Sequence, residues 1–544
     1  MTGLEPSTIR IGRRYRPARL DTPYDVLVVG SGIGGLTCAS LLAEAGRKVA
    51  VLEQHYTAGG YTHSYSRKGY EWDVGVHYLG DMGRPTSARR LFDFLTQGAV
   101  DWAPMDSHYD RFYLGGRRFD AVAGRQAFRD NLVASFPAEQ DAIDRYLAML
   151  SEVGRAMGPL SLARVLPPWL AGLLSPWLRY RLPPYLFRTT REVLGELTRD
   201  PDLIAVLTGQ WGDYGLPPGR SAFLMQALVA RHYLHGGYYP VGGSWRIAES
   251  MIPRIQRAGG EVFTYARVSR ILVEDRRVAG VMMEDGTRID ATQVVSDAGI
   301  LNTFGRLLAA EVAAAAGFDP AAPALRPSIG HLGMYIGLLG SAGELGLPRA
   351  NDWVFPGNDA DGAVARFLDD PNAPFPVVFI SFPSAKDPDF EQRHPGRSTI
   401  EIVAPAPYEW FERWRGTTWG KRGDDYDALK ERLAGRLLAT LYERMPQLRG
   451  RIDYYEVSTP LSTEWFAGYG RGELYGLDHT PERFRADTLG PRTRLSGLWL
   501  TGQDTMSCGV VGAMMGGVAT FAAMRGVLGS VPVLRRAFRG WPGA

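Results

Sequence analysis

The chain has 544 residues, a formal net charge of +3, 45% hydrophobic residues and 22% charged residues. This length exceeds one typical domain, and the composition is that of a folded protein with two closely packed domains or one elaborated α/β domain. The small net charge, and the lack of a basic stripe with interleaved aromatics, argue against a nucleic-acid partner.

The N-terminal region and the cysteines indicate a cytoplasmic protein. The first twenty residues contain five arginines but no apolar stretch of the kind that a secretory signal requires, so we expect no such signal. Cys38 and Cys508 lie in apolar, glycine-flanked segments, where a cysteine is typically a small reduced hydrophobe. We therefore expect no disulfide framework and no metal site.

Residues 24–52 have the pattern of a strand, a glycine-rich turn, a helix and a second strand. An apolar run over 24–29 predicts the first strand, helical spacing over 36–45 predicts the helix, and residues 48–52 resume a buried-strand pattern. Between them lies a GxGxxG turn. Gly30 permits the tight turn, Gly32 lets a pyrophosphate approach the backbone, and Gly35 lets the helix pack closely, so the segment predicts a dinucleotide-binding βαβ unit.

Glu53 stands at the end of the second predicted strand. An acidic side chain about twenty residues after the glycines can accept hydrogen bonds from both hydroxyls of an adenosine ribose. A second glycine pair, Gly59-Gly60, follows soon after and suggests backbone that closes over the rest of the dinucleotide.

From about Ser87 to Asp200 the pattern is helical and irregular. Within it, residues 162–187 mix tryptophans and leucines with prolines and arginines. This stretch is typical of an interfacial surface that contacts a membrane, and an ordinary proline-broken surface loop is an equally good interpretation.

The region after residue 240 predicts a helix and several strands in close succession. Ser244 is placed to cap a helix that runs to Ala258. A strand over 261–265, a hairpin of 267–274 with 277–284, and a strand over 293–296 follow, and we expect them to return to the first sheet.

The remaining elements are a surface helix and linker over 309–324, strands up to about 406, and a charged helix over 424–445 with leucines facing inward. Residues 505–524 carry no charge over a length that could span a membrane. Their glycines, and their position after residues 498–504, instead predict a buried helix packed closely on a cofactor.

The predicted fold class is α/β, with a discontinuous Rossmann-type domain and an inserted α+β substrate domain. We assign residues 24–83, 240–302 and 484–526 to the cofactor domain, residues 84–239 and 303–483 to the substrate domain, and residues 1–23 and 527–544 to terminal arms.

Several motifs together resemble the flavin-dependent polyene oxidoreductases: retinol saturases first, with carotenoid isomerases and bacterial phytoene desaturases as wider relatives. The resemblance covers nearly the whole chain. Besides the glycine turn with Glu53, it is carried by DVGVHYLG at 73–80, HGGYYPVGGSWRIAE at 235–249, VVSDAGILNT at 294–303, FPSAKDP at 382–388, YEWFERW at 408–414 and LWLTGQDTMSCGVVGAMMGG at 498–517.

The resemblance implies FAD as the bound dinucleotide and a large apolar tunnel. It implies a backbone contact of Val268 with the adenine, a contact of Asp504 with the ribitol or pyrophosphate, and a helix near Gly509 that points at the flavin pyrimidine. Asp504 stands two residues after Gly502, whereas many such flavoproteins have Gly and Asp adjacent. Asp504 therefore matches the family pattern less closely than Glu53 does. The expected cofactor-binding residues are Gly30, Gly32, Gly34, Gly35, Glu53, Gln54, Gly59, Gly60, Val268, Gly502, Asp504, Gly509 and Val510.

The resemblance also implies redox or isomerase chemistry on conjugated double bonds, with saturation of a retinoid- or carotenoid-like substrate favoured. A proton donor is then needed, and the candidates are Tyr475 and His479, with His77 next. Cis–trans isomerisation, desaturation and a non-catalytic flavin-binding lipid carrier are the alternatives. An apolar substrate favours peripheral membrane association, through residues 162–187 and the basic tail 531–541.

Overall fold

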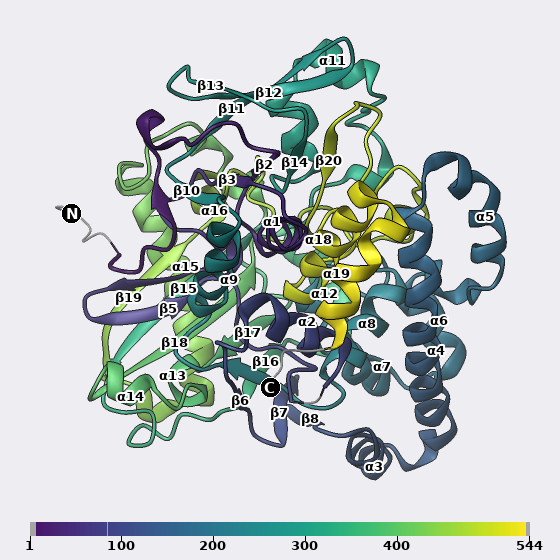
Figure 1. Ribbon diagram of the computed structural model, residues 1–544. Helices are drawn as coiled ribbons and strands as arrows, with labels where there is room; N and C mark the ends of the chain where they lie inside the picture. Colours follow the sequence, from purple (N-terminus) through teal and green to yellow (C-terminus); the bar gives the residue numbers. More distant parts are fainter. Residues whose placement is uncertain (1–6, 84, 540–544) are drawn as a thin grey trace.

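The computed structural model describes residues 7–83 and 85–539 (Figure 1). One of its two large sheets is parallel and has six strands. Its strand order is β1-β10-β3-β2-β14-β20. The strands are β1 (Arg13–Arg14), β10 (Glu261–Thr264), β3 (Val49–Leu52), β2 (Val26–Val29), β14 (Val294–Ser296) and β20 (Leu498–Leu500). Three segments that are far apart in the sequence therefore build one sheet, and β1 comes from residues that we assigned to a terminal arm.

Helices with small residues pack on this sheet. Helix α1 (Ile33–Glu44) contacts α9 (Trp245–Arg257) and α18 (Val510–Arg525). A Cβ atom at Gly517 of α18 would lie 2.5 Å from the carbonyl oxygen of Gly34, so the two helices can approach this closely only because residue 517 is glycine. The uncharged stretch 505–524 thus lies largely in this packed helix, and within residues 7–83 and 85–539 no helix is long and apolar enough to cross a membrane.

The expected hairpin forms a separate sheet. Strands β11 (Val268–Glu274), β12 (Arg277–Met283) and β13 (Arg288–Asp290) make an antiparallel sheet of their own, whereas β10 and β14 join the parallel sheet as expected.

A seven-stranded sheet forms the second half of the fold, with order β19-β15-β18-β17-β16-β7-β8. The strands are β19 (Ile452–Ser458), β15 (His331–Leu339), β18 (Arg397–Pro405), β17 (Val378–Ser381), β16 (Asn351–Phe355), β7 (His108–Leu114) and β8 (Arg117–Val122). The expectation that residues 87–200 are helical and irregular was therefore wrong for β7 and β8. Strand β7 pairs in parallel with β16, some 240 residues away, and local periodicity carries no signal of that pairing.

A group of helices lies at the right and lower edge of Figure 1, and most of them share a hydrophobic core with strands β7, β8 and β16. The group comprises α3 (Arg125–Ser135), α4 (Gln140–Val165), α5 (Pro168–Tyr180), α6 (Thr190–Leu197), α7 (Pro201–Leu207) and α8 (Phe223–Tyr233). Helix α5 projects at the right-hand edge of Figure 1. The stretch 162–187 is therefore largely helical, which disagrees with a proline-broken loop.

Two further expectations have clear outcomes. Helix α15 (Asp424–Arg444) buries Leu433, Leu437 and Leu441, as its pattern predicts. Helix α9 begins where expected, but Ser244 makes no side-chain cap. Its backbone is itself helical, with φ and ψ of −68° and −23°, and its hydroxyl donates to Asp73 at 2.7 Å.

The C-terminal helix α19 (Val527–Arg539) packs against α2 (Ser87–Thr96) and α18. Val533 and Ala537 are buried, and Leu534 and Phe538 pack against the same core. These four apolar side chains thus face the protein, whereas Leu528 at the start of the helix is 88% exposed. Trp541 lies outside the described residues.

The remaining elements are short. They are β4 (Ser64–Arg67), β5 (Tyr70–Asp73), β6 (Trp102–Pro104), β9 (Tyr238–Pro240), α10 (Ile300–Asn302), α11 (Ala310–Ala315), α12 (Ala360–Asp369), α13 (Pro383–Lys386), α14 (Phe390–Arg393), α16 (Pro460–Ala467) and α17 (Pro481–Arg485).

Candidate functional site

A cavity of about 1700 Å³ lies between the parallel sheet, the seven-stranded sheet and helices α4 and α8. This volume exceeds the ~300–1,000 Å³ of an ordinary ligand pocket, so there is room for a dinucleotide and a second molecule. Of the expected cofactor-binding residues, all except Gly35 and Gly502 line it: Gly30, Gly32, Gly34, Glu53, Gln54, Gly59, Gly60, Val268, Asp504, Gly509 and Val510.

The first glycine turn is a cradle that side chains would fill. A Cβ atom at Gly32 would overlap the Asp297 carboxylate, and one at Gly34 would overlap the backbone of Gly502. A Cβ atom at Gly35 would lie 2.5 Å from the carbonyl oxygen of Gly30. Glycine is therefore needed at position 35 for close packing of the turn, and this residue does not line the cavity. Helix α1 begins after Gly32 without a side-chain N-cap, and the Asp297 carboxyl lies beside the backbone of Gly32 and Gly35 at its start. Gly32, Ile33 and Gly34 at this helix start line the cavity, where phosphate oxygens would approach.

The second glycine pair folds back onto this turn. Gly59 donates its N–H to the Ser31 hydroxyl at 3.1 Å, and a Cβ atom at Gly60 would lie 2.9 Å from the Cα atom of Gly32. Both glycines have positive φ angles, of 121° and 54°. The two glycine motifs therefore form one backbone wall of the cavity.

Glu53 joins these motifs at the end of β3. Its carboxylate accepts from the Ser31 N–H and hydroxyl at 2.8 and 2.7 Å, and from the His55 N–H at 2.8 Å. The side chain is largely buried and still reaches the cavity. These bonds hold a carboxylate next to the phosphate cradle, where a ribose would lie.

The other expected contacts lie around the same wall. Val268 begins β11 beside Glu53, and the Gln54 side chain accepts from the Arg267 guanidinium at 3.2 Å. Asp504 accepts from the backbone N–H groups of Ile300 and Leu477, at 2.8 and 3.1 Å. Its carboxylate thus ties three chain segments together at the cavity wall.

Helix α18 points its N-terminus at the cavity. Gly509 caps it with a φ angle of 80°, the helix has no side-chain cap, and a Cβ atom at Gly509 would meet nothing within 4 Å. The preceding residue, Cys508, donates its N–H to Nε2 of His479 at 2.9 Å. The positive end of the helix dipole therefore faces open space next to the glycine cradle, which suits a negatively charged ring.

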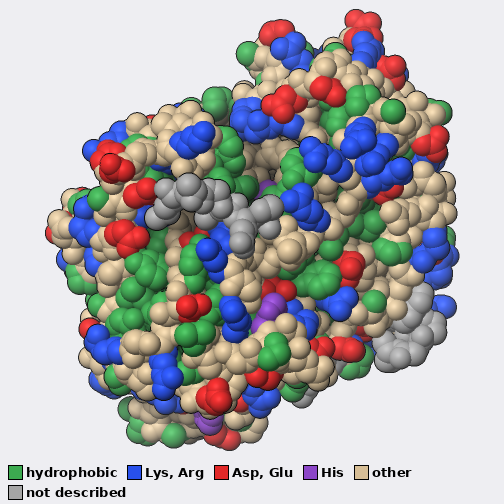
Figure 2. All heavy atoms as spheres, turned by 90° about the vertical axis from the view of Figure 1, so that its left-hand side faces the viewer, with side chains coloured by type: hydrophobic (Ala, Val, Ile, Leu, Met, Phe, Trp, Pro, Cys, Tyr) green, Lys and Arg blue, Asp and Glu red, His purple; other side chains and the backbone are tan. Residues whose placement is uncertain are grey.

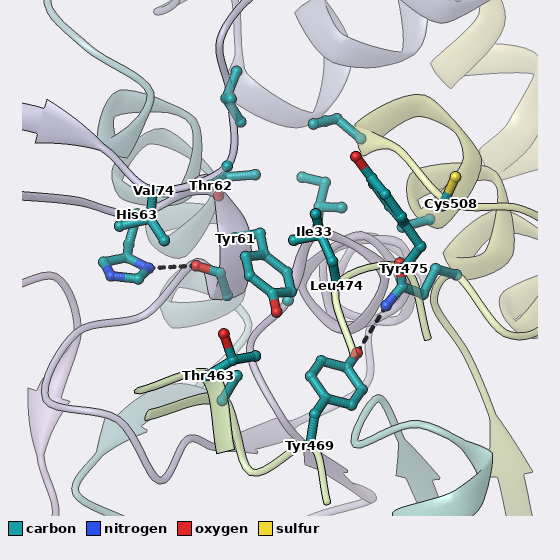
Figure 3. Close-up of a pocket in the computed structure, with 18 of the residues that line it drawn as sticks. Ile33, Tyr61, Thr62, His63, Val74, Thr463, Tyr469, Leu474, Tyr475 and Cys508 are labelled. Carbon is teal, nitrogen blue, oxygen red and sulfur yellow. Dashed lines mark hydrogen bonds between the residues drawn. The ribbon is translucent and has the colours of Figure 1, made fainter. Parts of the chain in front are cut away.

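The three expected proton donors occupy different positions. Tyr475 lines the cavity beside Cys508 (Figure 3), and its hydroxyl donates to the Gly212 carbonyl at 2.7 Å. His77 also lines the cavity. His479 is fully buried, does not line the cavity and accepts from Cys508, so in the structure it holds the loop before α18.

His77 is backed by a buried polar cluster. Its Nδ1 atom lies 2.7 Å from the Glu401 carboxyl, and its backbone carbonyl accepts from the Lys386 ammonium at 3.0 Å. Burial lowers the pKa of His77 to about 3 and that of Lys386 to about 7, and it raises the pKa of Glu401 to about 8. Burial therefore favours the neutral form of each of these groups.

One arm of the cavity is apolar. It runs among side chains of α8, the loop before it and the seven-stranded sheet, namely Trp211, Met225, Leu228, Val229, Trp353, Val377, Phe379 and Val403. Met157 and Ser161 of α4 also line the cavity. This arm can hold a long hydrocarbon next to the wall that carries Tyr475 and Gly509.

Another part of the cavity lining is charged. It includes the basic residues Arg10, Arg67, Arg267, Lys421 and Arg422 and the acidic residues Glu284, Asp427, Glu431 and Glu456. Arg67 is paired with Glu456, and Arg267 with Glu284. Figure 2 shows a hollow in the surface that Lys and Arg side chains border.

Sequence reasoning missed four ionisable residues that the structure places at or behind the cavity wall: Asp213, Asp297, Lys386 and Glu401. Asp297 and Lys386 each lie in a motif noted above, and Asp213 lies in the glycine- and aromatic-rich stretch 210–218, which was the available signal. Burial, with Glu53 and Asp504 next, raises the pKa of Asp297 to about 8. Glu401 lies in an ordinary strand pattern, so only the fold could identify it.

Comparisons with known proteins agree with this arrangement. A family model described as an NAD(P)-binding Rossmann-like domain matches residues 28–95. The chain is 38% identical over 521 residues to the all-trans-retinol 13,14-reductase of Danio rerio, which covers 92% of this chain and 86% of the relative. It is 31% identical over 527 residues to an inactive all-trans-retinol 13,14-reductase of the same species, covering 93% and 86%.

More distant likenesses extend further. The chain is 26% identical over 521 residues to prolycopene isomerase 2 of an Oncidium hybrid, covering 91% of this chain and 82% of the relative. Among solved structures, wild-type putrescine oxidase bound to putrescine has a TM-score of 0.58 at 17% identity, covering 92% and 98%. An oxidoreductase from Methanosarcina mazei has a TM-score of 0.55 at 20% identity, covering 91% and 98%. These two structures share the fold.

Proposed function

The chain belongs to the all-trans-retinol 13,14-reductase family, and we propose that it reduces a carbon–carbon double bond of an apolar polyene with FAD as its cofactor. The observation that carries this proposal is the continuity of the cavity: the glycine cradle with Glu53 and the apolar arm open into the same space. A dinucleotide in the cradle and a hydrocarbon in the arm would meet beside Gly509 and Tyr475.

The residues present fit FAD. Gly30, Gly32 and Gly60 line the cavity, where a pyrophosphate would approach their backbone, and the Glu53 carboxylate would accept the ribose hydroxyls. We propose that Val268 meets the adenine, and that Asp504, Gly509 and Val510 lie along the ribitol and flavin. When bound, FAD supplies hydride chemistry. In this assignment residues 24–83, 240–302 and 484–526 form the cofactor domain.

Identity favours a retinoid- or carotenoid-like substrate and the reductive direction, because the reductase is 38% identical and the isomerase 26%. The apolar arm would exclude water and align the double bonds beside the flavin. Function belongs to the site and not to the fold, so the reaction has to be tested directly.

Reduction of a double bond also needs a proton on the second carbon. Tyr475 and His77 line the cavity and are proposed as groups that contact the substrate there. For His479 we propose a positioning role, because its hydrogen bond to Cys508 sets the start of α18.

We also propose a membrane surface as a partner. Trp169, Leu173, Trp177 and Tyr180 are 75%, 71%, 53% and 90% exposed. Their spacing of four, four and three residues places them on one side of α5, and the Arg181 guanidinium lies 4.2 Å from the Trp177 ring centre. Such a stripe of aromatic and apolar side chains suits a helix that lies in a lipid interface. The apolar arm reaches the preceding helix, α4, so a lipid-soluble substrate would have a short path.

Two alternatives have specific support. Redox-neutral isomerisation is favoured by the likeness to prolycopene isomerase, and a flavin-binding lipid carrier is favoured by the 31% identity to a protein named inactive.

One experiment separates these functions. Purified protein with bound FAD is reduced with dithionite, mixed with all-trans-retinol, and the products are weighed by mass spectrometry. A product heavier by two hydrogen atoms, formed as the flavin is reoxidised, supports the proposal. An unchanged formula with altered geometry supports the isomerase, and retention of unchanged lipid supports the carrier.

A further inference from the structure

Asp213 lines the cavity, two residues after Trp211 of the apolar arm. It ends a short 3-10 helix, Trp211–Asp213, in the loop between α7 and α8. Its neighbours along the arm, Trp211 and Trp353, are aromatic. The carbonyl of Asp213 accepts from Sγ of Cys508 at 3.6 Å, so the residue lies beside the start of α18, where a flavin ring would be.

A second carboxyl group, Asp110, lies behind it and is fully buried. Asp110 accepts three hydrogen bonds: from Asn351 at 2.8 Å, from Gln210 at 2.8 Å and from the Tyr78 hydroxyl at 2.9 Å. The Asn351 side-chain oxygen in turn accepts from the Lys386 ammonium. Asp110 thus has three hydrogen-bond donors, which favour the ionised form of a carboxylate.

Asp213 has no comparable set of donors. Among residues 7–83 and 85–539, the single hydrogen bond of its side chain is to the Tyr78 hydroxyl, at 3.4 Å. A phenol has one proton, and its contact to Asp110, at 2.9 Å, is the shorter of the two. The Tyr78 oxygen also accepts from the Gln210 side chain at 3.3 Å. Asp213 therefore has at most one weak donor, which favours its neutral form.

The environment supports the same assignment. Burial raises the pKa of Asp213 well above its ordinary value, and the charge of Asp110 raises it further. Burial also raises the pKa of Asp110, but its three hydrogen bonds oppose that shift. Two neighbouring carboxyl groups with separated pKa values are a common arrangement for acid catalysis.

We infer that Asp213, as a neutral carboxylic acid, donates the proton to the substrate carbon, and that Tyr78 positions it. This inference rests on the proposed function. In the reduction, one alkene carbon gains a hydride from the reduced flavin, which dithionite or another two-electron reductant regenerates. The neighbouring carbon gains the proton as the O–H bond of Asp213 breaks and a C–H bond forms, which leaves an aspartate that solvent reprotonates after product release. The long contact to Tyr78 leaves the O–H group free to turn toward the substrate.

The test compares wild type, Asp213→Asn, Asp213→Glu and Tyr78→Phe, each purified with FAD. Single-turnover experiments with dithionite-reduced protein and all-trans-retinol measure the rate of the reduction step. Flavin retention and melting temperature show whether each variant is folded. Infrared spectra of the oxidised proteins report the protonated carboxyl group independently of activity.

We expect Asp213→Asn to lose the infrared band of one protonated carboxyl group and to slow reduction by about 10²- to 10⁴-fold, with flavin retention unchanged. Asp213→Glu should restore part of the rate, and Tyr78→Phe should slow it less than Asp213→Asn. In deuterated water the wild-type product should carry two solvent deuterium atoms on carbon, because the hydrogen on N5 of the dithionite-reduced flavin also comes from solvent.

An Asp213→Asn rate within about threefold of wild type, or an unchanged infrared band, would overturn the inference while leaving the proposed function in place. Absence of any saturated product from wild type would instead reject the proposed function, and the role of Asp213 with it. If Asp213→Asn loses its flavin, the comparison of Asp213→Glu with wild type and the infrared band of wild type decide the matter.

Discussion

The carboxylate of Glu53 accepts hydrogen bonds from both the backbone N–H and the hydroxyl of Ser31, at 2.8 and 2.7 Å. Ser31 stands inside the first glycine turn, and Glu53 ends the neighbouring strand, 22 residues later. The group expected to hold the ribose therefore also fixes the turn that would hold the phosphates.

Replacement of Glu53 by alanine should weaken FAD binding by about 2 kcal/mol, or about thirtyfold in Kd, because two charge-assisted hydrogen bonds are lost. Equilibrium dialysis with FAD measures this. Ser31→Ala is the matched control, since it removes one bond to Glu53 and leaves the carboxylate available, and it should cost about 1 kcal/mol. Equal losses in both variants would mean that Glu53 only orders the turn.

Gly34→Ala should destabilise the protein by about 1–3 kcal/mol and lower its FAD content, because the new methyl group would overlap the backbone of Gly502. Gly435→Ala is the control. A Cβ atom there meets nothing within 4 Å, and alanine favours the helix α15. Thermal unfolding and flavin absorbance give both quantities, and a Gly34→Ala protein as stable as Gly435→Ala would contradict the close packing of this turn.

Leu228→Trp should obstruct the apolar arm, because this side chain lines it from α8. We expect KM for all-trans-retinol to rise about tenfold or more while FAD content stays constant, since the cradle lies elsewhere. Leu339→Trp, at an exposed position at the end of β15, serves as control. Unchanged kinetics in Leu228→Trp would exclude this arm as the substrate channel.

The triple change Trp169→Ala, Leu173→Ala and Trp177→Ala should weaken binding to anionic vesicles at least about tenfold. A large apolar side chain is worth about 1.5–3 kcal/mol when it is fully transferred from water. Vesicle flotation measures binding, and Trp465→Ala, an exposed tryptophan on α16, is the control. Equal flotation of the triple variant and wild type would refute the proposed membrane contact.

Stability of the flavin-free protein should fall as pH rises from about 4 to 8. The native pKa of Asp297 is raised to about 8, mainly by burial, against an ordinary value of 3.8. In this window the folded state holds a proton that the unfolded state has released, so the free energy of unfolding decreases by up to about 1.4 kcal/mol per pH unit from this group.

Asp297→Asn removes that proton linkage with little change in shape. Urea unfolding of wild type and variant between pH 5 and 8 should therefore give a shallower slope for the variant. Parallel slopes would show that Asp297 is already ionised at neutral pH.

The sequence by itself determined the elements whose signals are local. The βαβ unit with Glu53, the inward leucines of α15 and the buried nature of α18 follow from periodicity, glycine spacing and the lack of charge, which act over a few residues. Family resemblance added the reaction class, and a relative at 38% identity supports it.

Only the tertiary structure decided which polar groups meet. Tyr78, Asp110 and Asp213 come from three distant segments, and they converge because β7 pairs with β16 and the loop before α8 closes over that pairing. Long-range packing also brings Ser244, which the sequence predicts as a helix cap, next to Asp73, and its hydroxyl donates to that carboxylate. A buried polar group bonds whichever partner the packing brings near, and that choice depends on strand register and sheet order, which local sequence does not encode.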